Sequence, residues 1–243
     1  MDAERPLGTT ERNVTVDAKP APITIGTAKT VALVVDMQND FAAKGGMFDR
    51  AGIDISVTRS AIEQTARVLA SVRKAEIPVV YLKQGHRPDL SDLGAADSPH
   101  RLRHRAVGTT VTAPDGRPSR ILIRDTWNTD IVDELRPQSG DTVIYKTRYS
   151  GFYATDLDAV LEAREVKWLI VAGATTSVCV ESTVRDAMFR DYRCVLLEDC
   201  MGEPIGHQLS RSNHEATLLT IQRLFGWVSS SAEVIRALDR VVG

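Results

Sequence analysis

Residues 166–190 read VKWLIVAGATTSVCVESTVRDAMFR, and this stretch decides the fold class. Its apolar run at 168–172 has the length and composition of a buried strand. Small residues at 173–177 then form a turn, and the amphipathic pattern that starts at Val178 predicts a helix with Cys179 in its first turn. Unpaired backbone N–H groups and the helix dipole favour a thiolate at such a position, so Cys179 is a candidate nucleophile. The alternative is that Cys179 is a small apolar residue of the core.

The same alternation of strand and helix extends along most of the chain. Apolar runs that predict strands stand at residues 30–35, 78–82, 142–145, 194–197 and 225–228. Helical patterns cover approximately residues 60–74, 131–135, 154–164, 209–222 and 232–241. Strands that alternate with helices indicate an α/β fold, with a doubly wound, mostly parallel six-stranded sheet and helices on both faces.

The length of 243 residues suits one domain of this class. Residues 1–25 are polar and contain prolines, so they predict an extended N-terminal arm, and residues 26–243 form the single domain. Residues 84–128 are an unusually long connection, of the kind that forms a lid, an interface segment or disorder. They include the basic run 100–105, which a solvated face explains better than an anion site.

Composition argues against several classes of partner. A formal net charge of −2 gives no reason to expect nucleic acid or an anionic membrane. No stretch approaches the ~20 apolar residues that span a bilayer, and the first residues lack the apolar core of a signal peptide. Three cysteines without metal-site spacing suit a reducing compartment. We therefore expect a cytoplasmic protein, in which Cys194 and Cys200 are structural.

Three reactive side chains, Asp36, Lys146 and Cys179, each follow a different predicted strand. Because the carboxyl ends of parallel strands lie on one edge of a sheet, these side chains can converge. A thiolate attacks a carbonyl carbon, a carboxylate moves protons, and an ammonium stabilises both anions. Taken singly, Asp36 is also a typical helix cap and Lys146 a typical surface lysine. Their coincidence at one edge favours a cysteine hydrolase.

Three segments carry a resemblance to a known family. They are VALVVDMQNDF at 31–41, VIYKTRYSGFYATDL at 143–157 and VAGATTSVCVESTVRDA at 171–187. These resemble the signature segments of the isochorismatase-like cysteine hydrolases, in the same order along the chain. The resemblance implies that residues 26–243 are a cysteine hydrolase domain. It also implies a homodimer or homotetramer.

The resemblance further implies roles for particular residues. Asp36, Lys146 and Cys179 match the catalytic triad of the family. The family also has a cis peptide bond at the turn after the fourth strand, here between Ala174 and Thr175. We expect this turn to aim backbone groups at the oxyanion, with the N–H groups of Val178 and Cys179 as the donors.

Different reactions occur within this family. Isochorismatases proper lack the cysteine nucleophile, so Cys179 argues against that activity. Nicotinamidases carry an Asp-x-His metal motif after the second strand, and here Gly85 stands where the acid should be. We therefore expect no metal and no cofactor. The nearby histidines are interpreted as ordinary loop residues: His86, His100 and His104.

Shorter motifs resemble two groups of ureide hydrolases in the family. Those similar to ureidoacrylate amidohydrolases stand at 36–38, 44–46, 148–152, 178–183 and 225–229. Residues 85–90 and 196–200 are similar to biuret hydrolases, to which triuret hydrolase is related. Ureidoacrylate carries a carboxylate, whereas biuret and triuret are neutral. Ile221 stands where biuret hydrolases present a glutamine, which argues against plain biuret.

The expected substrate is therefore a small linear ureide or amide, cleaved at its terminal C–N bond with release of ammonia. Gln84 and Tyr149 match family positions that face substrate. The full set of side chains expected to form the pocket wall is Phe41, Gln84, His86, Trp127, Tyr149 and Tyr153. The alternatives are an amidase of an N-carbamoyl amino acid or a maleamate-like acid, and a non-catalytic binding module, against which the intact triad argues.

Overall fold

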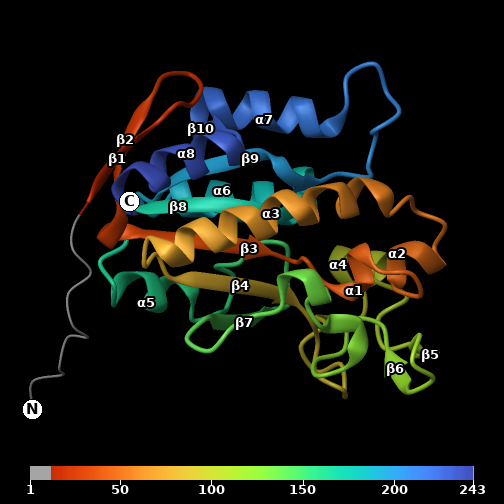
Figure 1. Cartoon of the computed structure of the whole chain (residues 1–243). Helices are drawn as coiled ribbons and strands as arrows, with labels where there is room; N and C mark the ends of the chain where they lie inside the picture. Colours follow the sequence, from red (N-terminus) through yellow and green to blue (C-terminus); the bar gives the residue numbers. More distant parts are fainter. Residues whose placement is uncertain (1–11, 243) are drawn as a thin grey trace, which may run out of the picture.

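A six-stranded parallel sheet runs through the middle of the computed structural model, which describes residues 12–242 (Figure 1). The strands lie in the order β10–β9–β8–β3–β4–β7, and every neighbouring pair is parallel. Their bounds are β3 Thr30–Val35, β4 Val79–Gln84, β7 Thr142–Lys146, β8 Trp168–Ala174, β9 Arg193–Gly202 and β10 Gly226–Ser229. The predicted fold class, an α/β protein with a doubly wound parallel sheet, is confirmed.

The central strands β3 and β8 are buried along their whole length. A strand that helices cover on both faces has no solvent side, which is why TVALVV and WLIVAGA show no apolar–polar alternation. The edge strand β7 differs, because Val143 is 44% exposed. Burial therefore increases from the edge toward the pair of strands at which the candidate site is built.

Helices cover both faces of the sheet. α3 (Ser56–Lys74) and α8 (Ser231–Val242) pack on one face, and α3 crosses the sheet in Figure 1. α5 (Leu157–Glu162), α6 (Glu181–Met188) and α7 (Asn213–Leu224) pack on the other. Neighbouring side chains of each strand enter opposite layers, so Val34 packs with the first group of helices and Leu33 with the second.

Several helix ends differ from the predicted ones. α7 begins at Asn213 rather than near residue 209, because Ser212 and Glu215 form a reciprocal capping box. α3 begins four residues before the predicted residue 60. The helix predicted at 131–135 is only the 3-10 turn Asp133–Leu135. Within residues 12–242, no helix is both long and apolar enough to cross a membrane.

The segment before the sheet is folded rather than extended. β1 (Asn13–Val16) and β2 (Ile23–Gly26) pair as an antiparallel hairpin. Alternate residues of this hairpin, including Val16 and Ile25, are fully buried in the core that α8 also enters. The prediction of an extended arm over 1–25 is therefore wrong for residues 13–25, since period-two apolar residues give the hairpin a buried face. Residues 1–11 of that predicted arm lie outside the described residues.

The long connection after β4 is an ordered lobe, which we call the connecting lobe (residues 85–128). It contains α4 (Pro99–Arg103) and a small hairpin of β5 (Thr110–Thr112) with β6 (Pro118–Arg120). A separate small core holds it against the segment after β3. The buried members of this core are Phe41, Leu93, Val107, Ile121, Leu122 and Ile123. In Figure 1 the lobe lies at the end of the sheet where β3 and β4 finish.

Candidate active site

The topology of the sheet produces a crevice beside β3. The chain leaves β3 toward β4 on one side, whereas β8 lies on the other side of β3. Ligands of α/β proteins bind at such a reversal of strand order, at the carboxyl ends of the strands. Asp36 directly follows β3, Lys146 is the last residue of β7, and Cys179 follows the turn after β8. The structure thus brings the three predicted reactive side chains to one edge of the sheet.

Asp36 and Lys146 form a fully buried ion pair, with Lys146 Nζ 2.7 Å from Asp36 Oδ2. Asp36 has a positive φ of 51°, a backbone region that aspartate tolerates better than most residues. Its backbone N–H donates to Leu82 O at 2.9 Å, which ties the start of the loop to β4. The backbone after β3 is therefore held in place where it presents the carboxylate.

Two more oxygens accept the remaining protons of the Lys146 ammonium. Lys146 Nζ donates to Gln84 Oε1 at 2.9 Å and to the carbonyl of Arg148 at 3.2 Å. Because an ammonium has three N–H donors, these oxygens and Asp36 define its orientation. Gln84 is held in turn by Gln38, whose side-chain oxygen accepts from Gln84 N at 2.7 Å and whose amide nitrogen donates to Gln84 O at 3.0 Å.

The turn that leads to Cys179 requires glycine at its start. Gly173 has a φ of 145°, and a Cβ there would lie 2.2 Å from Val35 O of β3. The next peptide bond, Ala174–Thr175, is cis, the isomer that the family resemblance implies. A π-helical turn, Thr176–Val180, then leads into α6 and carries Cys179.

One of the two expected oxyanion donors is already paired in this structure. The backbone N–H of Val178 donates to Thr175 O at 3.1 Å. Two contacts that the sequence analysis missed hold the same turn: Ser177 N donates to Glu203 Oε2 at 2.6 Å, and Thr176 Oγ1 lies 3.0 Å from His214 Nδ1. Glu203 is almost fully buried, yet it follows β9 in a segment without a motif that signals this contact.

The electrostatics of the three groups favour a neutral thiol. Burial raises the pKa of Cys179 to about 12, an effect that Lys146 opposes and Asp36 reinforces. The expectation of a thiolate from the helix terminus is therefore wrong for the free protein, because the cost of desolvation exceeds the effect of the helix end. Burial also raises the pKa of Asp36, against the influence of Lys146. Burial lowers the pKa of Lys146, but the adjacent Asp36 carboxylate, with a smaller effect of Cys179, outweighs it and raises that pKa.

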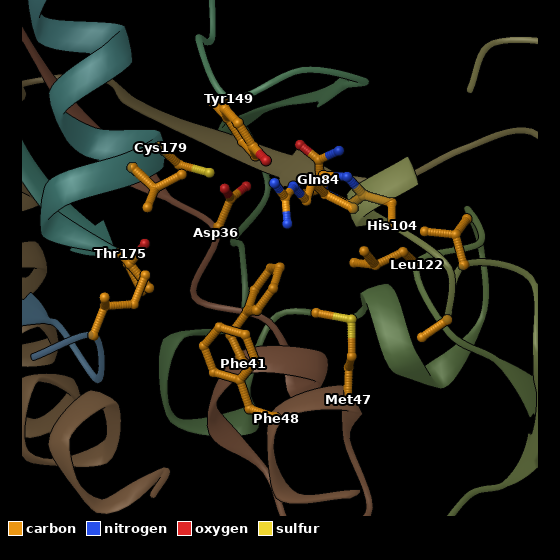
Figure 2. Close-up of a pocket in the computed structure, with 16 residues that line it drawn as sticks. Asp36, Phe41, Met47, Phe48, Gln84, His104, Leu122, Tyr149, Thr175 and Cys179 are labelled. Atoms are coloured by element: carbon orange, nitrogen blue, oxygen red, sulfur yellow. The ribbon is translucent and has the colours of Figure 1, made fainter. Parts of the chain in front are cut away.

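Asp36 and Cys179 line a cavity of about 350 Å³ (Figure 2). Three of the predicted wall residues, Phe41, Gln84 and Tyr149, line it as well, as does the turn made by Ala174, Thr175 and Val178. In Figure 2 the sulfur of Cys179 and the carboxylate of Asp36 point into the same space.

The other three predicted wall residues do not line this cavity. His86 is fully buried behind Gln84, with its Nε2 3.4 Å from Gln84 Nε2. Trp127 lines a separate cleft with Lys83. Tyr153 is 54% exposed, with the guanidinium of Arg148 over its ring. These positions were inferred from their loops, and the backbone path within each loop turns the side chains away.

Most of the remaining wall comes from the connecting lobe and from the short helix α2 (Met47–Arg50). The lining residues that the sequence analysis missed are Met47, Phe48, Arg103, His104, Ala106, Val107, Leu122 and Ile205. The basic run at 100–105 could have indicated part of this wall, because Arg103 and His104 belong to it. Its interpretation as a solvated face holds only in part, since Arg103 is exposed yet lines the cavity.

The three loop histidines gather at the wall that His104 forms. The ring of His100 lies 4.0 Å from that of His104 and 5.8 Å from that of His86. Burial, the neighbouring histidines and Arg148 lower the pKa of His100 to about 3. In the part of the chain that the structure describes, no group of three or more His, Cys, Asp or Glu side chains is arranged to hold a metal ion.

Comparison with known proteins places these features in a family. The isochorismatase domain matches residues 30–233. Ureidoacrylate amidohydrolase RutB of Methylorubrum extorquens is 41% identical over 98% of this chain and 96% of its own length. The same enzyme of Yersinia enterocolitica is 40% identical over 88% of this chain and 91% of its own length.

Solved structures agree with the sequence relatives. A cysteine hydrolase from Pseudomonas syringae pv. phaseolicola is 32% identical, with a TM-score of 0.76 over 89% of this chain and 95% of its own. The N-carbamoylsarcosine amidase of Thermoplasma acidophilum is 26% identical, with a TM-score of 0.63 over 84% of this chain and 98% of its own. The chain therefore belongs to the isochorismatase family, as a hydrolase of the amidohydrolase kind.

Proposed function

We propose that this amidohydrolase cleaves the terminal C–N bond of a small linear ureide, with Cys179 as nucleophile, Asp36 as proton carrier and Lys146 as the stabilising cation. The observation that supports this most is that Cys179 and Asp36 share one cavity while Lys146 pairs with Asp36 at 2.7 Å. The relatives named for ureidoacrylate and for N-carbamoylsarcosine support a carbamoyl group as the reacting centre.

In the first step the thiol of Cys179 gives its proton to Asp36 while sulfur attacks the terminal carbamoyl carbon. The burial that raises the pKa of Asp36 makes it a stronger base than an ordinary carboxylate. The new C–S bond leaves negative charge on the carbonyl oxygen. The Lys146 ammonium and the backbone N–H of Cys179 stabilise that charge.

In the second step the C–N bond breaks, and ammonia leaves with the proton that Asp36 returns. The product on the enzyme is a thioester of Cys179 with the rest of the ureide. Water then gives a proton to Asp36 and attacks the thioester carbon. The C–S bond breaks, the sulfur regains a proton, and a carbamate is released, which can lose carbon dioxide.

The far side of the cavity favours a ureide that carries a carboxylate. Arg103 and His104 line it together with the apolar residues Phe48, Val107 and Leu122. An arginine can bind a carboxylate through paired hydrogen bonds, whereas neutral biuret or triuret gains little from it. We therefore propose ureidoacrylate, or a ureido acid of similar size, ahead of biuret and triuret.

A second candidate substrate is an N-carbamoyl amino acid. It shares both the terminal carbamoyl group and the carboxylate, and the likeness to N-carbamoylsarcosine amidase favours it. The two candidates differ in shape, because ureidoacrylate is planar whereas the α-carbon of an N-carbamoyl amino acid is tetrahedral.

Ammonia release from ureidoacrylate, biuret, triuret and N-carbamoyl amino acids tests the proposal directly. We expect the highest kcat/KM with a ureido acid, together with a covalent mass increase on the peptide that contains Cys179 after rapid acid quenching. Absence of ammonia from every compound of the panel would contradict the proposed function.

A further inference from the structure

His86 lies next to the candidate site but outside its cavity, and its hydrogen bonds point in a defined direction. The side chain is fully buried at the start of the connecting lobe. Its Nε2 faces Gln84 Nε2 at 3.4 Å, and its Nδ1 lies 3.2 Å from Asp92 Oδ1. Asp92 is held in turn by Arg124, at 3.1 Å, and by the backbone N–H of Arg87.

The proton positions in this row follow from the ammonium of Lys146. An ammonium can only donate, so the atom of Gln84 that faces it must be the amide oxygen. The amide nitrogen of Gln84 therefore faces His86, and because it too can only donate, His86 Nε2 must be the acceptor. The single proton of a neutral imidazole then sits on Nδ1, where it donates to the carboxylate of Asp92.

We propose that His86 is a positioning residue, which acts through Gln84 to fix the Lys146 ammonium against Asp36 and Cys179. The row Asp92–His86–Gln84–Lys146 allows only one orientation of the Gln84 amide. If the amide rotated by half a turn, its NH₂ group would face the ammonium, and Lys146 would lose one of its three acceptors. This role rests on the proposed function of the triad, but it can be measured without a substrate.

The charges around His86 keep it in the accepting form. Burial lowers its pKa, and His104 and Arg148 act in the same direction, whereas Asp92 opposes them. Arg124, on the segment that lies beside His86, pairs with Asp92 and offsets part of its charge. Protonation of His86 would convert Nε2 into a donor that faces another donor, so the row is intact only while this histidine is neutral.

The test compares His86→Gln with His86→Met. Glutamine and methionine have similar length, but only glutamine offers an acceptor near the position of Nε2. The readout is the rate at which iodoacetamide alkylates Cys179, followed across pH and assigned by mass spectrometry. Cys194 and Cys200 are fully buried and serve as internal references. We expect alkylation at a fixed pH to slow roughly ten-fold or more in His86→Met, and His86→Gln to recover most of the rate.

Other outcomes overturn the proposal. If both variants are alkylated at the wild-type rate, the acceptor on His86 has no role in positioning Lys146. If both fold with native circular dichroism and slow equally, His86 acts only by filling space. Either result overturns the proposal. If His86→Met does not fold, Asp92→Ala and Asp92→Asn replace the pair, because asparagine retains an acceptor for Nδ1–H and alanine does not. Equal alkylation rates in that second pair would overturn the proposal too. Failure of the ureide panel leaves this measurement unaffected, since it uses no substrate.

Discussion

The two halves of the cavity are built by different means. Asp36, Lys146 and Cys179 stand at or just beyond the carboxyl ends of parallel strands, whose backbone hydrogen bonds to neighbouring strands set their positions. The opposite half comes from α2 and the connecting lobe, which a small core and buried polar contacts hold in place. Groups that react must be held within a fraction of an ångström, whereas groups that select a substrate can come from a more variable segment. The comparison predicts that changes in the first half alter chemistry and stability, and changes in the second alter selectivity.

The largest effect is expected at Cys179. Cys179→Ala removes the atom that forms the covalent bond, so kcat should fall by about 10⁴-fold or more, with little change in unfolding temperature. Ammonia release and thermal unfolding measure the two quantities. Cys194→Ala is the matched control, since Cys194 is also buried in the sheet but far from the cavity, and it should keep its turnover. Substantial turnover in Cys179→Ala would remove the nucleophile from the mechanism.

Lys146→Met should show how far the buried pair supports the fold. It leaves the carboxylate of Asp36 buried without its cation, which costs about 3–5 kcal/mol of unfolding free energy. Urea unfolding at neutral pH measures this loss. In the double variant Asp36→Asn/Lys146→Met no carboxylate is left buried, so the loss of unfolding free energy should be smaller than in Lys146→Met alone. Equal losses in the single and double variants would mean that packing, and not charge, dominates.

Asp40 joins the two halves, and it should make stability depend on pH. Its carboxylate accepts from Met47 N at 2.9 Å, Leu122 N at 2.8 Å and Asn128 Nδ2 at 2.5 Å. Burial raises its pKa to about 6 from the usual 3.8, against the influence of these donors. The folded state therefore holds the proton more tightly than the unfolded state. The contribution of Asp40 to stability should decline as pH rises from about 4 to about 6, by up to ~3 kcal/mol, and level off above. Buried histidines such as His100, whose pKa is lowered, contribute in the opposite direction.

Urea unfolding of the wild type and of Asp40→Asn between pH 4 and pH 7 measures this contribution as the difference between their unfolding free energies, because the other groups titrate alike in both. The wild type should lose stability relative to Asp40→Asn as pH rises, because the variant cannot titrate there. Asp97→Asn, an exposed position in the connecting lobe, is the matched control and should follow the wild-type profile. A constant difference between wild type and Asp40→Asn would assign the pH dependence to other groups.

The smallest effect is expected at Arg103. Arg103→Ala should raise KM for ureidoacrylate about five- to ten-fold, because an exposed arginine contributes only about 1 kcal/mol to binding. The kcat should change little, and biuret should be unaffected because it has no carboxylate. Arg105→Ala removes the same charge two residues away, at a position that does not line the cavity. Equal changes with both substrates would mean that Arg103 shapes the wall rather than binds the anion.

The sequence was sufficient to predict the sheet and the reacting half of the site. Buried strands produce unbroken apolar runs, and a reactive side chain that follows such a run must lie at the carboxyl edge. The wall of the connecting lobe could not be predicted in the same way. Its residues follow no period, and the direction of a side chain such as Tyr153 or Trp127 depends on the backbone angles of one particular loop.

The sequence by itself determined the fold class, the family and the meeting of Asp36, Lys146 and Cys179 at one edge of the sheet. These depend on local patterns, namely apolar runs, turn glycines and short motifs, that survive without knowledge of distant contacts. Only the tertiary structure decided that residues 13–25 fold back as a hairpin, that burial raises the pKa of Cys179, and that His86 lies behind Gln84. The physical reason is that desolvation and hydrogen-bond direction are set by residues far apart in the chain, which meet only in the folded protein.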